Sequence, residues 1–305
     1  MPGLPPLLPQ LLRHFLHSVL TSLGQIYFQS APLAGLVLLL CLYLSSPYMA
    51  LCALLAATVA TLSAYAPGFS PRLRRQGLYG FNAALSAIGL CSLYRYTPAL
   101  LGWITLAGIS STLLSHAFLR WSTLPVLSLP FVLVMWLAAY AGPTTGLQAL
   151  NADAASSACS SAVLTYPFCI SAKIAFMESP ALGLLILSTV TWRRWQLGAW
   201  VVLGAMLAWY AWILGDSLWP QAISATLATG IGVNCMLVTL ALSVYQRAWI
   251  WRILACGWCI LLCLILAKLG VSYFTLPFVL ASWSALALSA PVAAQDGKTQ
   301  QAAAA

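Results

Sequence analysis

Residues 28–40 read FQSAPLAGLVLLL, and residues 176–188 read FMESPALGLLILS. Phe, Pro and Gly stand at matching places in these two stretches, which are offset by 176 − 28 = 148 positions. Each stretch continues as a long apolar run with no alternation of polar and apolar residues. Such runs favour helices over strands, so the sequence predicts an all-α fold in which at least one element occurs twice.

Composition places these helices in a membrane. The chain has 305 residues, of which 62% are hydrophobic and only 6% are charged, whereas soluble domains carry about 25% charged residues. A helix needs roughly 20 apolar residues to cross the hydrocarbon core, so this length allows about ten spans. The formal net charge of +9 does not indicate a nucleic-acid partner, because no basic stretch with interleaved polar residues accompanies it. Basic loops of a membrane protein set its orientation instead.

Two further pairs of segments repeat in the same order. GLYGFNAALSAIGL at 77–90 aligns with TGIGVNCMLVTLAL at 229–242, and LPVLSLPF at 124–131 aligns with VSYFTLPF at 271–278. The second of these pairs places Ser128 opposite Thr275, and the first places Asn82 opposite Asn234. Three ordered islands at nearly constant offsets indicate an internal duplication. We expect the two asparagines to tie broken backbone segments.

Apolar runs predict five spans in each half. They lie at about 31–46, 48–66, 76–93, 98–118 and 124–141, and then at 180–192, 196–214, 222–245, 250–267 and 272–291. An odd number of spans inverts the second half relative to the first. With that topology one side collects Arg72, Arg74, Arg75, Arg120, Arg193, Arg194, Arg247 and Arg252, and the other collects Arg95 and Lys268. By the positive-inside rule the first side is cytoplasmic, as are both termini.

The segments before each first span, about 20–29 and 168–178, are short and polar, and we interpret them as half-membrane helices. The expected fold is therefore a polytopic membrane protein with two inverted homologous repeats of five transmembrane helices plus a half-membrane helix each, and a pore where the repeats meet. The expected organisation is an interfacial segment at 1–19, a first repeat at 20–141, an extracytoplasmic linker at 142–164, a second repeat at 165–291 and a disordered tail at 292–305.

The three doubled motifs, LGQIYFQSAPLAG, GLYGFNAAL and LPVLSLPF with their looser second copies, resemble the bacterial urea transporters. The resemblance extends from about 20 to 290. It implies a homotrimer in a bacterial inner membrane, with a channel-like path for urea through each protomer. In that family, facing phenyl rings form a flat slot lined by oxygen atoms, with the threonines of the two signatures at its centre.

Carried over by motif, the resemblance implies a lining drawn from both halves. The first half supplies Gln25, Ile26, Phe28, Phe81, Leu85 and Ser128, and the second supplies Lys173, Ile174, Phe176, Val233, Leu237 and Thr275. Urea is small, planar and neutral, so a narrow aromatic slot with oxygen atoms along one edge suits it. A neutral solute requires no coupling ion, no nucleotide-binding motif is present, and no cofactor is expected.

Three of these residues depart from the family pattern. Ser128 replaces threonine and keeps the hydroxyl, while Val233 replaces a phenylalanine of the slot wall. Lys173 replaces Gln or Glu, and lysine offers three donors but no acceptor. An ionisable group at membrane depth is functional by default. Lys173 can meet the urea oxygen, pair with Glu178 or narrow the vestibule, and the sequence leaves these alternatives open.

The sequence is also compatible with functions other than urea transport. Lys173 leaves open a permease for another small polar solute or a small anion, and the fold also suits a non-conducting membrane scaffold or sensor. Four acidic residues and three scattered histidines indicate neither an enzyme nor a metal site. Most of the nine cysteines lie in apolar runs as small hydrophobes. Cys159 and Cys169 lie in or beside the linker, where the sequence leaves their pairing open.

Overall fold

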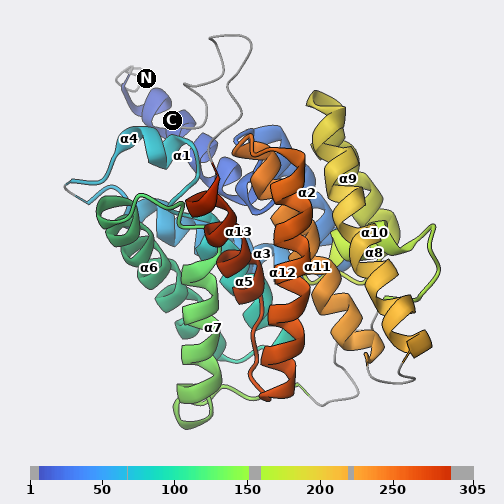
Figure 1. Ribbon diagram of the computed structural model, residues 1–305. Coiled ribbons are helices and arrows are strands. Elements are labelled where there is room, and N and C mark those ends of the chain that lie inside the picture. Colours follow the sequence, from blue (N-terminus) through green and yellow to red (C-terminus); the bar gives the residue numbers. More distant parts are fainter. Residues whose placement is uncertain (1–6, 67, 151–158, 219–222, 290–305) are drawn as a thin grey trace. The chain divides into compact units, whose positions relative to one another are not determined.

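The computed structural model describes the chain except for residues 1–6, 67, 151–158, 219–222 and 290–305 (Figure 1). The predicted tail 292–305 and part of the predicted linker therefore lie outside the described residues. The described part is helical, with one isolated β-bridge between Tyr94 and Ala149. The α-helices are α1 (Leu7–Gly24), α2 (Pro32–Ser45), α3 (Pro47–Ser63), α4 (Pro71–Arg75), α5 (Phe81–Leu93), α6 (Pro98–Trp121), α7 (Leu129–Ala141), α8 (Tyr166–Lys173), α9 (Pro180–Arg193), α10 (Trp195–Leu218), α11 (Ala225–Val244), α12 (Trp249–Lys268) and α13 (Leu276–Leu288).

Each of the ten predicted spans coincides with one α-helix, which confirms the all-α membrane fold. Among the described residues, α6, α10, α11 and α12 are long and apolar enough to cross a bilayer alone. The α1 and α2 helices, bent by 75° at a short break, provide up to one more span. The α5, α7 and α13 helices have 13 residues each and therefore rise only about 20 Å.

Helix starts differ from the prediction where a tight turn precedes the helix. The predicted spans at 124–141 and 272–291 begin as helices only at Leu129 and Leu276, because Leu127 and Phe274 adopt positive φ angles of 45° and 48°. The span predicted at 76–93 likewise begins at Phe81, after a turn in which Gly77 has φ 77°. A local left-handed residue ends one regular element before the next begins, and apolarity alone does not reveal it.

The first half-membrane helix is longer than predicted. The sequence placed it at 20–29, but α1 runs for 18 residues from Leu7 to Gly24 and continues as a 3₁₀ turn, η1 (Gln25–Tyr27). Much of the predicted interfacial segment 1–19 belongs to this helix. The second half-membrane helix, α8, has eight residues and lies within the predicted 168–178 region except for its first two residues.

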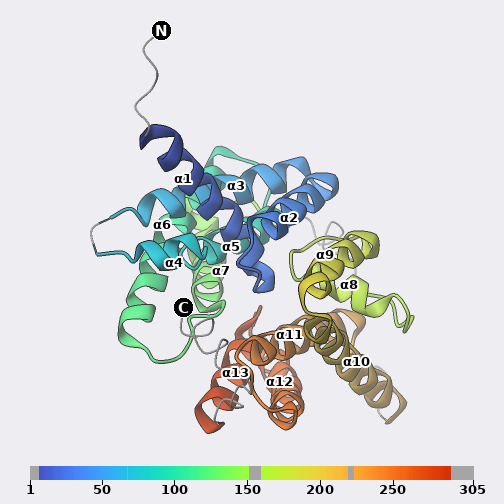
Figure 2. The ribbon, with the colours of Figure 1, turned by 90° about the horizontal axis from the view of Figure 1, so that it is seen from above.

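The chain divides into two compact units. Unit 1 contains residues 1–121 and 137–150, and unit 2 contains residues 122–136 and 151–305. In unit 1, α3 packs on α5 and α6, and α1 packs on α2. In unit 2, α11 packs between α10 and α12, and α13 lies along α12 (Figure 2). Segment 122–136, from the first half of the sequence, thus belongs to the same unit as the second half.

Two helix pairs, one in each half of the sequence, approach each other closely at corresponding glycines. A methyl group added at Gly35 of α2 would overlap the backbone carbonyl of Leu20 in α1, and one added at Gly183 of α9 would overlap the backbone carbonyl of Phe168 in α8. The two glycines are 183 − 35 = 148 positions apart, and the two residues whose carbonyls they approach are also 168 − 20 = 148 positions apart. Glycine is required at both places because any larger residue would force the two backbones apart.

A disulfide joins Cys159 to Cys169, with a Cα–Cα distance of 5.9 Å. This answers the question that the sequence left open. The other seven cysteines are free and buried, as expected for small hydrophobic residues in apolar helices. In unit 2 the disulfide ties the middle of α8 to the stretch that precedes this helix.

Candidate functional site

The predicted lining residues begin at two turns of the same shape. In unit 1 the amide of Phe28 donates to the carbonyl of Gln25 (2.9 Å), and in unit 2 the amide of Phe176 donates to the carbonyl of Lys173 (3.0 Å). Phe28 has φ 57° and Phe176 has φ 56°. Non-glycine residues in this left-handed region are uncommon and concentrate at functional sites. The turns project both phenyl rings from the ends of the half-membrane helices, and both rings are half-buried.

Each turn also contains a side-chain pair between its first residue and the residue five positions later. In unit 1, Gln25 Nε2 donates to Ser30 Oγ (2.7 Å) and to the carbonyl of Gln76 (2.9 Å). In unit 2, Lys173 Nζ lies 2.8 Å from Glu178 Oε2. Of the three alternatives for Lys173, the structure therefore has the ion pair with Glu178.

The hydroxyl groups of the two repeated signatures meet in unit 2. Ser128 Oγ lies 2.6 Å from Thr275 Oγ1, a hydrogen bond in which either oxygen can donate. Their side chains precede α7 and α13 by one residue, and both residues are buried, with 5% and 8% of their surface exposed. Folding thus brings together two predicted site residues that are 275 − 128 = 147 positions apart.

Contacts around this hydroxyl pair are exchanged between the two copies of the signature. Trp136 Nε1 donates to the carbonyl of Ser272 (2.6 Å), and Trp283 Nε1 donates to the carbonyl of Pro125 (2.8 Å). The two tryptophans are 283 − 136 = 147 positions apart, and the two acceptor residues are 272 − 125 = 147 positions apart. Each copy of the signature therefore donates to the other the same hydrogen bond that it accepts. Reciprocal contacts of this kind are what two equivalent surfaces make with each other. Sequence reasoning missed both tryptophans, although their equal spacing was visible.

Aromatic rings gather beside the hydroxyl pair. The ring of Phe131 lies edge-on to Phe274 at 5.8 Å and to Phe176 at 6.3 Å, measured between ring centroids. Edge-to-face packing at these distances is favourable. Phe176 was predicted as a site residue, but Phe131 and Phe274 were not. Their place in the two signatures was the signal that could have identified them.

Asn234 holds the broken backbone ahead of α13, as predicted. Its Nδ2 donates to the carbonyls of Gly230 (2.9 Å) and Phe274 (3.0 Å), and its Oδ1 accepts from the amide of Phe278 (2.9 Å). These bonds fix the left-handed turn at Phe274 and satisfy an amide of the first turn of α13, which has no partner within its own helix. Asn82, its counterpart, is fully buried in α5.

The remaining predicted residues lie in helices or turns of their own units. Ile26, Leu85 and Phe81 are buried in unit 1, while Ile174 and Leu237 are buried and Val233 is half-buried in unit 2. Gln25, Ile26, Phe28, Phe81 and Leu85 thus belong to unit 1, and the other seven predicted residues belong to unit 2. In the part of the chain that is described, no group of three His, Cys, Asp or Glu side chains is placed to hold a metal ion.

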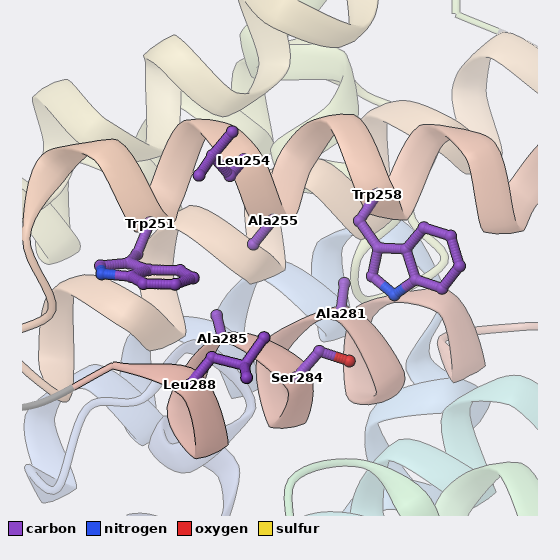
Figure 3. A pocket seen from close by; sticks show the side chains of 8 residues that line it. All are labelled: Trp251, Leu254, Ala255, Trp258, Ala281, Ser284, Ala285 and Leu288. Atoms are coloured by element: carbon purple, nitrogen blue, oxygen red, sulfur yellow. The ribbon is translucent and has the colours of Figure 1, made fainter.

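A separate apolar groove of about 310 Å³ lies between α12 and α13 (Figure 3). Trp251 and Trp258 stand at opposite ends of it in the view, and Ser284 supplies a hydroxyl. That hydroxyl donates to the carbonyl of Leu280 (2.9 Å) within its own helix. None of the predicted site residues lines this groove, and it offers a polar solute few partners.

Comparison with known proteins gives a consistent result. A family model described as "Urea transporter" matches residues 16–162 and 169–305. The chain is 29% identical over 131 residues to "Urea transporter 1" of Rattus norvegicus, covering 40% of this chain and 34% of that protein. It is 30% identical over 135 residues to "Urea transporter 1" of Mus musculus, covering 41% and 35%. The chain thus spans about a third of the length of the curated relatives it matches.

Proposed function

Because the chain belongs to the urea transporter family, we propose that it carries urea passively across a membrane along a channel-like path. The observation that carries this proposal is the family match, which spans both halves of the chain. Membership of this family indicates a transporter, and we propose that no catalytic step accompanies passage.

We propose that the path follows the twelve residues identified from the motifs. The hydroxyl pair of Ser128 and Thr275 supports this, because hydroxyl oxygens can accept from the N–H groups of urea as these lose water. The neighbouring rings of Phe176, Phe131 and Phe274 support an aromatic wall. A flat solute can slide between aromatic faces where a rounder solute is excluded, so the path would select by shape as well as by hydrogen bonding.

The alternative substrate, a small anion drawn by Lys173, finds less support. Glu178 lies in ion-pair contact with the Lys173 ammonium and offsets its charge. A permease for another small neutral solute stays the competing proposal. Acetamide and thiourea are the solutes that distinguish it from urea transport.

The remaining features of the proposal concern assembly and orientation. We propose an inverted-repeat architecture, with the contacts exchanged between 125–136 and 272–283 in support. We also propose a homotrimer in an inner membrane with both termini in the cytoplasm, in keeping with the arginine asymmetry. Native mass spectrometry in detergent would test the trimer directly, and a monomer or dimer as the main species would contradict it.

Stopped-flow light scattering on proteoliposomes under a urea gradient tests the function. We expect fast, saturable urea entry that thiourea inhibits, with acetamide and formate as comparison solutes. Liposomes without protein provide the baseline. Urea entry no faster than in empty liposomes would contradict the proposal, and saturable formate entry would favour the anion alternative.

A further inference from the structure

The first residues of the two turns make equivalent contacts with opposite electrical character. Gln25 and Ser30 form a neutral hydrogen bond in unit 1, while Lys173 and Glu178 form an ion pair in unit 2. The positions correspond, since 173 − 25 and 178 − 30 both equal 148. Relative to the first half, Lys173 stands in place of glutamine and lacks its acceptor oxygen, while Glu178 stands in place of serine and adds a carboxylate. These two residues contact each other.

The Lys173 side chain is largely enclosed, and that of Glu178 is not. Their exposed fractions are 5% and 50%. Lys173 Nζ lies 2.8 Å from Glu178 Oε2, within the usual distance of a charge-assisted contact. An enclosed ammonium without a partner is costly, and Glu178 is the partner that offsets this cost. The α8 helix ends at Lys173, and its carbonyl end stabilises a cation there.

We propose that Glu178 is a specificity-determining residue, and that Lys173 and Glu178 together form a donor–acceptor site for urea. This inference rests on the proposed urea path. Lysine supplies donors for the urea oxygen but has no acceptor for urea N–H groups. The half-exposed carboxylate supplies that acceptor, since its two oxygens have about four lone-pair sites. A neutral planar molecule with an oxygen on one edge and N–H groups on another matches the pair.

The net charge of the pair governs which planar solutes it admits. As an ion pair the site is neutral, so it favours neither guanidinium, which is planar and cationic, nor formate, which is planar and anionic. Removing Glu178 leaves the ammonium of Lys173 uncompensated at an enclosed position, and removing Lys173 leaves the half-exposed carboxylate of Glu178 without its cation. The two single substitutions therefore shift the preference for charged analogues in opposite directions, an effect that a purely structural tie between α8 and α9 does not produce.

Inhibition of urea entry into proteoliposomes by guanidinium and by formate tests this. In Lys173→Gln we expect the guanidinium inhibition constant to fall about tenfold, as for the gain of one charge-assisted hydrogen bond. In Glu178→Gln we expect guanidinium inhibition to weaken, formate inhibition to strengthen, and the urea concentration at half-saturation to rise about tenfold. The double variant Lys173→Gln/Glu178→Ser reproduces the Gln25–Ser30 pair and should conduct urea with no preference for either ion.

Two controls keep the test decisive. Asp216→Asn removes an exposed carboxylate at the far end of α10 and changes the net charge as Glu178→Gln does; it should leave both inhibition constants unchanged. Glu178→Asp retains the charge if Glu178→Gln folds poorly, and it should keep the guanidinium response of the unmodified protein. Guanidinium constants that shift in the same direction in both single variants, or not at all, would overturn the inference. Absence of urea entry in the unmodified protein would instead overturn the proposed function.

Discussion

At the scale of single residues, the Ser128–Thr275 hydroxyl pair is the most direct test of the path. Thr275→Val exchanges a hydroxyl for a methyl group of similar size and removes the partner of Ser128. Losing one hydrogen bond of about 1.5 kcal/mol from a rate-limiting position lowers flux roughly tenfold. We therefore expect urea flux to fall by that factor in proteoliposomes while the variant elutes as the unmodified protein does on size exclusion.

Ser284→Ala is the matched control for this substitution. It removes another hydroxyl of the α13 region, one that bonds only within its own helix and lines the separate groove. We expect its flux to match that of the unmodified protein. Unchanged flux in Thr275→Val would remove Thr275 from the urea path.

At the scale of elements, the close pairing of half-membrane helices with the helices after them depends on glycine. Gly183→Ala places a methyl group against the backbone of α8, where no flexible side chain can give way. We expect a loss of roughly 1–3 kcal/mol, the usual cost of overpacking. Thermal unfolding followed by size exclusion in detergent measures it.

Gly257→Ala in α12 is the matched control, because nothing lies within 4 Å of an added methyl group there. Alanine is the better helix former by up to about 1 kcal/mol, so this variant should be neutral or slightly more stable. Equal unfolding temperatures for the two variants would show that the α8–α9 contact does not limit stability.

The Cys159–Cys169 disulfide ties another element, α8, to a residue ten positions earlier in the sequence. Closing a loop of this size restricts the unfolded chain and stabilises the fold by about 2–3 kcal/mol. The double variant Cys159→Ser/Cys169→Ser should unfold at a lower temperature than the unmodified protein. Reductant should lower the unfolding temperature of the unmodified protein but not that of the variant, and a reductant effect of equal size in both would contradict this.

At the scale of the whole molecule, the positions of the helices were predictable but their exact starts were not. Apolar runs introduced by proline placed α2 and α9 within a residue or two, since proline at the first helical position fixes the backbone for a helix. The starts of α7 and α13 were misplaced by four or five residues. Their left-handed turns at Leu127 and Phe274 depend on partners such as Asn234 that lie far away in sequence.

The candidate site was predictable to the extent that it is repeated. Doubling identified Ser128 and Thr275 as a pair before their contact was known, and it marked Phe176 through its counterpart Phe28. The repeat did not identify the partners of Trp136 and Trp283. These partners are backbone carbonyls, which any residue type can supply. Whether Lys173 would reach Glu178 was also undetermined, because a flexible four-carbon side chain has many rotamers.

Orientation is a prediction for the entire chain. The excess of eight arginines on one side over two basic residues on the other predicts that both termini lie in the cytoplasm. A green fluorescent protein fused to the C-terminus should fluoresce, and alkaline phosphatase fused there should be inactive. Phosphatase inserted after Gly146, in the loop following α7, should be active, and the reverse pattern at the two positions would contradict the proposed topology.

The Ser128–Thr275 hydroxyl pair has one more consequence, which concerns the direction of urea flow. Because either oxygen can be the donor, the bond can reverse its polarity by rotating two hydrogen atoms while every heavy atom stays in place. The remaining lone pairs and proton can therefore point toward either end of the proposed path. In the proposed path this pair therefore contributes no fixed polarity, and we expect it to cause no rectification of urea flow.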